Sequence, residues 1–292
     1  MKDIFTIIFR LTLSCILAGT VMGTTFVLTN KAKKHNEHVK EERVAFSLLG
    51  FEGEAPESVE MNTVYRYVVS RAGKQLIGYL MPVNDGFTFL QLDLDGKLAA
   101  SDSVNLTPES ASAEGDRESA ILAALGPGNT IRFAEEFKVI SEDGQRVAYL
   151  ISGKFPGFKT HIAVMVALDT DFSIIGFEVL EHEEDPGLGA EIEQPYFKNQ
   201  FKDKPFEVLK NIDVVKAPIP DEYLDALEVE LTPEAVQKIM EKYRDNDIYA
   251  LTGATISTVA VADGLKGMVK KFAYRVDILD SVTEKQSIAG TF

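Results

Sequence analysis

A run of hydroxyl-bearing and very small side chains near the C-terminal end of the chain has residue types suited to carrying a charged group. It reads Leu251-Thr252-Gly253-Ala254-Thr255-Ile256-Ser257-Thr258. The Thr255 hydroxyl could carry a phosphate, and Gly253 and Ala254 leave space beside it for a large ligand or a modifying enzyme. An ordinary loop with a helix cap is the alternative interpretation, since small polar residues are common before helices.

Helical patterns are expected on both sides of this run. Thr232-Pro233 has the residue types of an N-cap and a first helical position, and the apolar periodicity that follows predicts a helix ending near residues 245–246. A second helix is expected to follow, with Ser257 or Thr258 as its N-cap, because the apolar residues Val261, Leu265, Met268, Val269 and Phe272 repeat the helical period. Thr255 is therefore predicted just outside a helix N-terminus, where free N–H groups and a partial positive charge stabilise a phosphate.

An acidic loop forms a second candidate segment, Glu181-His182-Glu183-Glu184-Asp185-Pro186-Gly187-Leu188-Gly189-Ala190. Its carboxylates could hold a hard metal ion or act in acid–base chemistry, but adjacent carboxylates more often form a solvated loop. His182 is the one histidine of this loop and could hydrogen-bond a ligand or a partner. Gly187 and Gly189 would let the backbone approach a flat ring closely, although plain turn glycines are an equal alternative.

Both segments resemble one family. Residues 252–258 are similar to the flavinylation motif S/T-G-A-T-x-S/T-S/T of the FMN-binding domain family, and residues 181–189 resemble its E-H-x-E-T-P-G-L-G segment. The family includes the G subunits of Rnf electron-transport complexes and the C subunits of sodium-translocating NADH:quinone reductases. The chain departs from the pattern at Tyr249, where an Asp is usual, and at Asp185, where a Thr is usual.

The resemblance implies a cofactor and its residues. FMN would be attached covalently, through a phosphoester to Thr255. The other cofactor-binding residues carried over from the two motifs are Thr252, Gly253, Ala254, Ser257, Thr258, His182, Glu184, Gly187, Leu188 and Gly189. No nucleophile, base and orienting residue form a visible hydrolase pattern, so we assign no catalytic residue and no metal site.

Composition narrows the function classes. The chain has 292 residues, 45% hydrophobic and 26% charged, which is an ordinary globular composition. Its net charge of -15 argues against nucleic acid as a partner. The single cysteine, Cys15, excludes an intrachain disulfide and a Cys-ligated iron–sulfur cluster, so a redox function needs a cofactor held by other means.

The N-terminal region predicts a membrane anchor. Residues 1–10 form a flank, and residues 11–29 contain no charge and are long enough for a transmembrane helix. A cleaved signal peptide is the alternative. The flank that follows residues 11–29 has more Lys and Arg than the flank that precedes them, and the positive-inside rule places the more basic flank in the cytoplasm. The family resemblance implies the opposite, a single-pass protein of the bacterial inner membrane with its flavin domain on the outer, periplasmic side, and we follow the resemblance.

An internal repeat organises the rest of the chain. Residues 68–81 and 139–151 share a pattern of short strands separated by turns, which predicts antiparallel hairpins. We expect an α+β fold with a repeat module without cofactor at 41–105, an FMN-binding domain at 113–275 and a C-terminal tail at 276–292. The first copy lies outside the resemblance and is interpreted as a docking or spacing element.

These observations favour one function over two others. We expect a covalent-FMN electron carrier without turnover of its own, in a membrane-bound, ion-translocating oxidoreductase complex of the Rnf type. Its partners would be the other subunits, a flavin transferase during maturation and membrane lipid through residues 11–29. The alternatives are a membrane-anchored, non-catalytic binding or scaffold module, and a flavin domain of a regulatory or separate reductase system.

Overall fold

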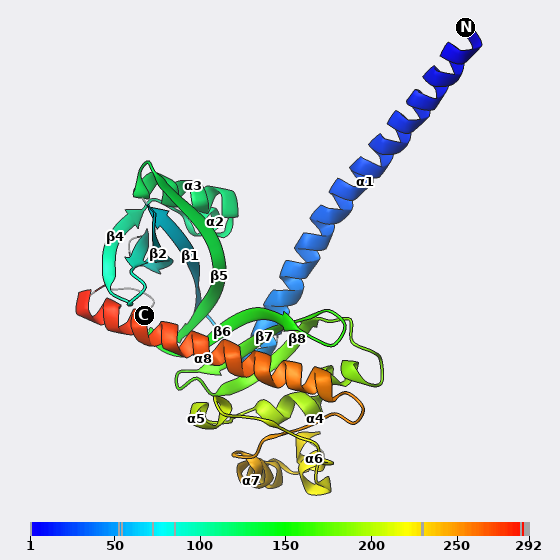
Figure 1. The fold of residues 1–292 in the computed structure, drawn as a ribbon. Helices are drawn as coiled ribbons and strands as arrows, with labels where there is room; N and C mark the ends of the chain where they lie inside the picture. The colour runs from blue at the N-terminus through cyan, green and yellow to red at the C-terminus, as the bar shows by residue number, and fades with distance from the viewer. Residues whose placement is uncertain are drawn as a thin grey trace.

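The computed structural model describes residues 2–288 except 52, 54, 72, 85, 229, 230 and 287. Residue 1 of the predicted N-terminal flank, and residues 287 and 289–292 of the predicted tail, therefore lie outside the described residues. The described chain has an α+β fold, which confirms the predicted fold class: one long N-terminal helix, one large antiparallel sheet and a helical C-terminal part (Figure 1).

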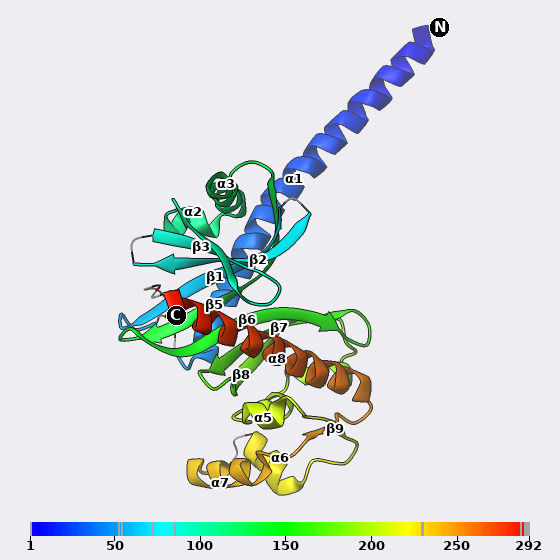
Figure 2. The same ribbon diagram turned by 60° about the vertical axis from the view of Figure 1, so that its left-hand side comes forward.

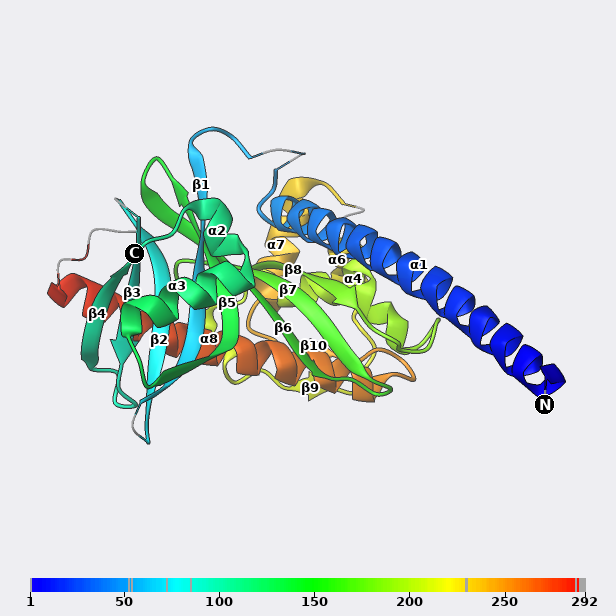
Figure 3. The ribbon, with the colours of Figure 1, turned by 90° about the horizontal axis from the view of Figure 1, so that it is seen from above.

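The N-terminal helix α1 (Lys2–Leu48) projects from the body and meets it only at its C-terminal end (Figures 1 and 3). Its segment Ile4–Asn30 is long and apolar enough to cross a membrane, and none of it is buried against the protein. A signal sequence has the same properties. The end of α1 packs on the sheet through the buried Ala45, and Lys40 Nζ donates to the Leu180 carbonyl at 3.0 Å.

The sheet has eight strands in the order β4-β3-β2-β1-β5-β6-β7-β8. The first repeat forms β1 (Val59–Arg71), β2 (Lys74–Val83), β3 (Gly86–Leu92) and β4 (Leu98–Val104). The second forms β5 (Asn129–Glu142), β6 (Gln145–Pro156), β7 (His161–Asp169) and β8 (Ile174–Glu181). All neighbouring strands are antiparallel, as the hairpin pattern predicted. The two copies join where β1 pairs with β5.

Two helices connect the copies: α2 (Pro108–Ser112) and α3 (Glu114–Leu125). Arg117 of α3 fixes them to the sheet, since its buried guanidinium donates to the Tyr67 hydroxyl at 2.7 Å and lies 3.9 Å from the centre of the Tyr65 ring. The first copy thus ends in a packed helical cover over β1 and β5.

The C-terminal part consists of short elements and one long helix. The short elements are η1 (Gly189–Glu193), α4 (Pro195–Lys198), η2 (Asn199–Phe201), α5 (Phe206–Leu209), β9 (Val214–Val215), α6 (Asp221–Leu227), α7 (Pro233–Tyr243) and β10 (Ile248–Tyr249). Figures 1 and 2 show α6 and α7 at the end of the molecule opposite the free end of α1. The predicted start of α7 at Thr232-Pro233 is confirmed, and its end lies within a few residues of the predicted one.

The long helix α8 (Thr255–Gln286) crosses the sheet and closes the main core. Val261, Leu265 and Val269 are fully buried, as their helical spacing predicted. The helix does not stop at the expected domain boundary of 275. Residues 276–286 of the expected tail continue α8, because Val276 and Leu279 are also fully buried and Arg146 of β6 forms a bidentate ion pair with Asp280 at 2.8 Å.

Candidate functional site

Three segments that are distant in the sequence meet at the start of α8. They are the loop after β6, the acidic loop after β8 and the first turn of α8 with the residues before it. Together they enclose a cavity of about 300 Å³. Its lining consists of Phe158, Glu184, Asp185, Leu188, Gly189, Gly253, Ala254, Thr255, Ile256 and Ser257.

Glu184 holds the three segments together. Its side chain is only 5% exposed, and its Oε1 accepts hydrogen bonds from the backbone N–H groups of Phe158 at 2.8 Å and Lys159 at 3.2 Å. Its Oε2 accepts a hydrogen bond from the Ser257 hydroxyl. A buried carboxylate is stable only when its oxygens are satisfied in this way. Glu184 therefore orients one loop and the helix start relative to its own loop.

Gly189 and Gly157 are necessary for this arrangement. A Cβ on Gly189 would lie 2.6 Å from Glu184 Oε2 and 2.7 Å from Ser257 Oγ. A Cβ on Gly157 would lie 2.5 Å from Glu184 Oε1. All three distances are shorter than a van der Waals contact, so a side chain at either position would displace the Glu184 carboxylate. The last glycine of the Pro-Gly-Leu-Gly sequence thus permits close packing of the acidic loop on α8.

Thr255 is the first residue of α8 and is partly exposed to the cavity. The expectation that Ser257 or Thr258 caps the helix is wrong, since both lie inside its first turn. The Thr258 hydroxyl accepts a hydrogen bond from the Leu251 N–H at 3.0 Å and donates to the Ala254 carbonyl at 3.1 Å. These bonds fold the preceding loop over the helix start. The first N–H groups of a helix have no partners within it, and Thr255, Ile256 and Ser257 of this first turn line the cavity.

The cavity includes most, but not all, of the residues assigned from the sequence. Thr252, Thr258, His182 and Gly187 are outside its lining. His182 lies behind the loop, where its Nδ1 accepts a hydrogen bond from the Glu184 N–H at 3.0 Å and its Nε2 is 3.1 Å from Glu193 Oε1. It orients the acidic loop in this structure. Among the described residues, no group of three or more His, Cys, Asp and Glu side chains is arranged to hold a metal ion.

The sequence patterns missed the apolar rim of the cavity. Phe158 is 56% exposed, Leu188 44% and Ile256 60%. Only Leu188 was assigned in advance, because Ile256 occupies the variable position of its motif and Phe158 follows a strand in an unrelated loop. Lys159 Nζ lies 2.5 Å from Asp185 Oδ1 beside this rim, and that hydrogen bond raises the pKa of Lys159. A partly apolar, flat ligand could lie on the rim while its charged end meets the helix N-terminus.

Comparison with known proteins identifies the segment that holds this site. Residues 157–270 match the FMN-binding domain family. This match confirms the resemblance found in the sequence. It begins at the loop after β6 and includes all three segments of the cavity, whereas β1 to β6 lie outside it.

Two curated relatives share part of their length with this chain. The first is the G subunit of the proton-translocating ferredoxin:NAD(+) oxidoreductase complex of Clostridium ljungdahlii. The two chains are 29% identical over 143 aligned residues, and this alignment covers 49% of this chain and 63% of that protein. The second is the G subunit of the ion-translocating oxidoreductase complex of Methanosarcina acetivorans. The two chains are 31% identical over 134 aligned residues, and this alignment covers 46% of this chain and 55% of that protein. The chain thus spans less than two thirds of either relative.

Two solved structures are more distant. NqrC of Shewanella oneidensis is 14% identical with a TM-score of 0.43, over 80% of this chain and 91% of that one. The C subunit of the Na(+)-translocating NADH-quinone reductase of Parabacteroides distasonis is 23% identical with a TM-score of 0.31, over 45% of this chain and 57% of that one.

Proposed function

We propose that the chain carries FMN covalently on Thr255 and acts as an electron carrier. The observation that supports this most directly is the position of Thr255, a partly exposed hydroxyl in the first turn of a long helix inside the cavity built by both motif segments. Attachment would join the hydroxyl oxygen to the flavin phosphate as a phosphoester. The N–H groups of the first turn of α8 stabilise a phosphate at that place.

The size of the cavity and the apolar side chains around its opening suit FMN. At about 300 Å³ it is at the small end of ligand sites, and its open side is surrounded by the exposed side chains of Phe158, Leu188 and Ile256. The ring system of FMN would lie partly outside the cavity, against this apolar rim. When bound, FMN supplies the electron-transfer chemistry, and the protein supplies attachment and orientation. Gly253 and Ala254 leave the hydroxyl accessible to a flavin transferase.

The proposal extends to a membrane complex. The two curated relatives are subunits of ion-translocating oxidoreductase complexes. The segment Ile4–Asn30 of α1 has the length and composition of a membrane anchor. We therefore propose an electron-carrying subunit of the same kind of complex, held in the inner membrane by α1 with its flavin domain on the outer side.

Covalent attachment is tested by replacing one hydroxyl. Protein produced with its flavin transferase should have the mass of one added FMN, and after denaturing electrophoresis the band should fluoresce under ultraviolet light. Thr255→Val should lose both signals, because valine lacks the hydroxyl oxygen through which the flavin phosphate would be attached. Thr232→Val is the matched control, since Thr232 precedes α7 but its side chain makes no cap hydrogen bond. Fluorescence that persists in Thr255→Val would refute the attachment site.

A further inference from the structure

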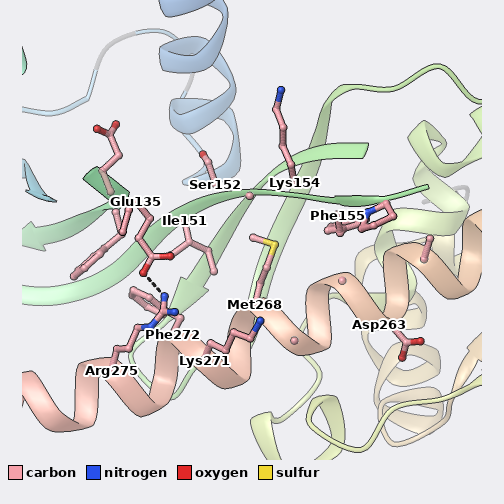
Figure 4. A pocket seen from close by; sticks show the side chains of 18 residues that line it. Glu135, Ile151, Ser152, Lys154, Phe155, Asp263, Met268, Lys271, Phe272 and Arg275 are labelled. Atoms are coloured by element: carbon pink, nitrogen blue, oxygen red, sulfur yellow. Dashed lines mark hydrogen bonds and ion pairs between the residues drawn. The ribbon is translucent and has the colours of Figure 1, made fainter. Parts of the chain in front are cut away.

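A second and larger cavity lies on α8, beyond the site described above. It is a groove of about 720 Å³ between β5, β6 and α8. Figure 4 shows Met268 and Arg275 reaching from α8 toward the two strands, with Lys271 between them along the helix. None of its lining residues belongs to the cavity around Thr255.

The groove exists because β5 and β6 separate. They pair only from Phe137↔Ile151 to Glu142↔Gln145. Before Phe137, β5 has a bulge at Ala134. In the pairing of β5 with β1, Phe133 lies opposite Tyr67 and Glu135 lies opposite Arg66, so Ala134 has no partner residue in β1. A bulge bends its strand and increases the local twist, which turns the first part of β5 away from β6.

The separation leaves two strand edges open. Residues 129–136 of β5 pair with β1 on one side, and residues 152–156 of β6 pair with β7 on one side. No other strand of the described chain pairs with their facing sides. An open strand edge presents unpaired N–H and C=O groups that can hydrogen-bond to another extended chain.

Three glycines shape the floor of this groove. Gly153 and Gly264 allow β6 to pack directly on α8, since a Cβ at Gly153 would lie 2.7 Å from Met268 and one at Gly264 would lie 2.4 Å from the Phe155 ring. Gly267 is different: no atom lies within 4 Å of a Cβ built on it. Gly267 therefore faces the empty part of the groove.

The charge at the β5 end of the groove is positive. The Glu135 carboxylate is shared by two guanidinium groups: Arg275 forms an ion pair with it, and Arg66 NH1 lies 3.6 Å from it. The exposed Lys271 is one turn of α8 before Arg275. Glu136 also lines this end of the groove, so three cationic side chains meet two carboxylates there and leave one positive charge in excess, in a chain whose net charge is -15.

We infer that this groove is a docking site for an extended segment of a partner protein, which adds a strand between β5 and β6 and places an acidic side chain near Arg275 and Lys271. The open edges favour a strand over a helix, because only an extended chain can pair with both. The positive end favours an acidic segment. The inference does not depend on flavin.

The test uses the full-length protein in detergent micelles and hydrogen–deuterium exchange of backbone amides. The probe is an end-blocked octapeptide of alternating valine and glutamate, and the comparison peptide has lysine in place of glutamate. The acidic peptide should slow exchange in residues 130–136 and 152–155. Lys271→Glu should weaken the apparent affinity of the acidic peptide by about fivefold, the effect of reversing one exposed charge.

A groove-filling variant separates docking from unspecific adhesion. Gly267→Leu should abolish the protection, because its side chain fills the groove without a clash at Cβ. Gly115→Leu in α3 is the matched control and should retain it, since Gly115 also lies in a helix with no atom within 4 Å of its Cβ. Absence of protection in the unmodified protein would overturn the inference, as would equal protection by the lysine peptide or unchanged protection in Gly267→Leu.

Discussion

At the scale of single residues, burial distinguishes Glu184 from the other acids of its loop. Glu181 and Glu183 are exposed, as expected of a solvated acidic run, whereas Glu184 is buried and accepts three hydrogen bonds. The sequence could not reveal this difference, because the partners at Phe158, Lys159 and Ser257 are far away in the chain. Its contacts support a role in positioning the site, and any direct contact of Glu184 with flavin stays a prediction.

Glu184→Ala should therefore loosen the site while leaving the Thr255 hydroxyl intact. It leaves two backbone N–H groups and a buried hydroxyl without their acceptor, which costs on the order of 1–3 kcal/mol. Urea unfolding followed by circular dichroism measures the loss of stability, and the flavin content per chain should fall with it. Glu183→Ala is the matched control and should change neither quantity, because Glu183 is exposed. Equal behaviour of the two variants would contradict the positioning role.

Lys204 is a second buried charged residue, with a structural role. It is 1% exposed, and its Nζ donates to the carbonyls of Tyr243, Arg244 and Asn246 at 3.4, 2.9 and 2.6 Å. Tyr243 is the last residue of α7 and Arg244 is its C-cap, so the lysine caps the C-terminal end of that helix. Its bond to Asn246 fixes the chain that leads to β10. Burial lowers the pKa of Lys204 to about 8, against the opposing effect of Asp245 and Asp247.

Lys204→Met should destabilise the protein by about 1–3 kcal/mol at neutral pH, because it leaves those carbonyls without a donor. The pKa of Lys204 is lower in the folded than in the unfolded chain, so the unfolded chain binds more protons between about pH 8 and pH 10. The stability of the unmodified protein relative to Lys204→Met should therefore rise with pH over that window. Denaturant unfolding of both proteins at several pH values measures this difference, and a constant difference would contradict it.

At the scale of elements, periodicity predicted the helices well and their ends poorly. The apolar positions of α8 followed from their spacing, and the start of α7 followed from the residue types of Thr232-Pro233. The start of α8 did not, because it depends on bonds between Thr258 and residues 251 and 254. The continuation to Gln286 was missed because contacts with distant strands stabilise it, including the Arg146–Asp280 pair. Tertiary contacts thus decided the boundaries.

The packing of α8 on β6 predicts opposite effects for two neighbouring glycines. Gly264→Ala places a methyl group 2.4 Å from the Phe155 ring, and such overpacking costs about 1–3 kcal/mol. Gly267→Ala meets no atom and should stabilise the helix by about 0.5–1 kcal/mol, because alanine favours helix over glycine. Thermal unfolding of both variants measures the two effects. A loss of stability in Gly267→Ala as large as that in Gly264→Ala would contradict this packing.

At the scale of the whole molecule, the sequence repeat becomes a shared sheet. The repeat predicted hairpins in each copy, but it could not show how the copies combine, because pairing of β1 with β5 joins residues far apart in the chain. The main core contains Val64, Tyr79 and Leu90 of the first copy with Phe137 of the second and Leu279 of α8. Only the second copy continues into the two motif segments.

The shared core predicts that the copies unfold together. A variant lacking residues 41–105 would lose the partner strand of β5 along its whole length and expose the apolar face under the second half of α8. We expect it to lack a cooperative unfolding transition, whereas the full chain should show a single one. The chain contains no Trp, so far-ultraviolet circular dichroism is the suitable probe. A variant lacking residues 1–34 is the control and should keep the transition, because the segment Ile4–Asn30 buries nothing against the body. A cooperative transition in the variant lacking residues 41–105 would show instead that the second copy and α8 fold alone, and that the first copy is an addition to a complete domain.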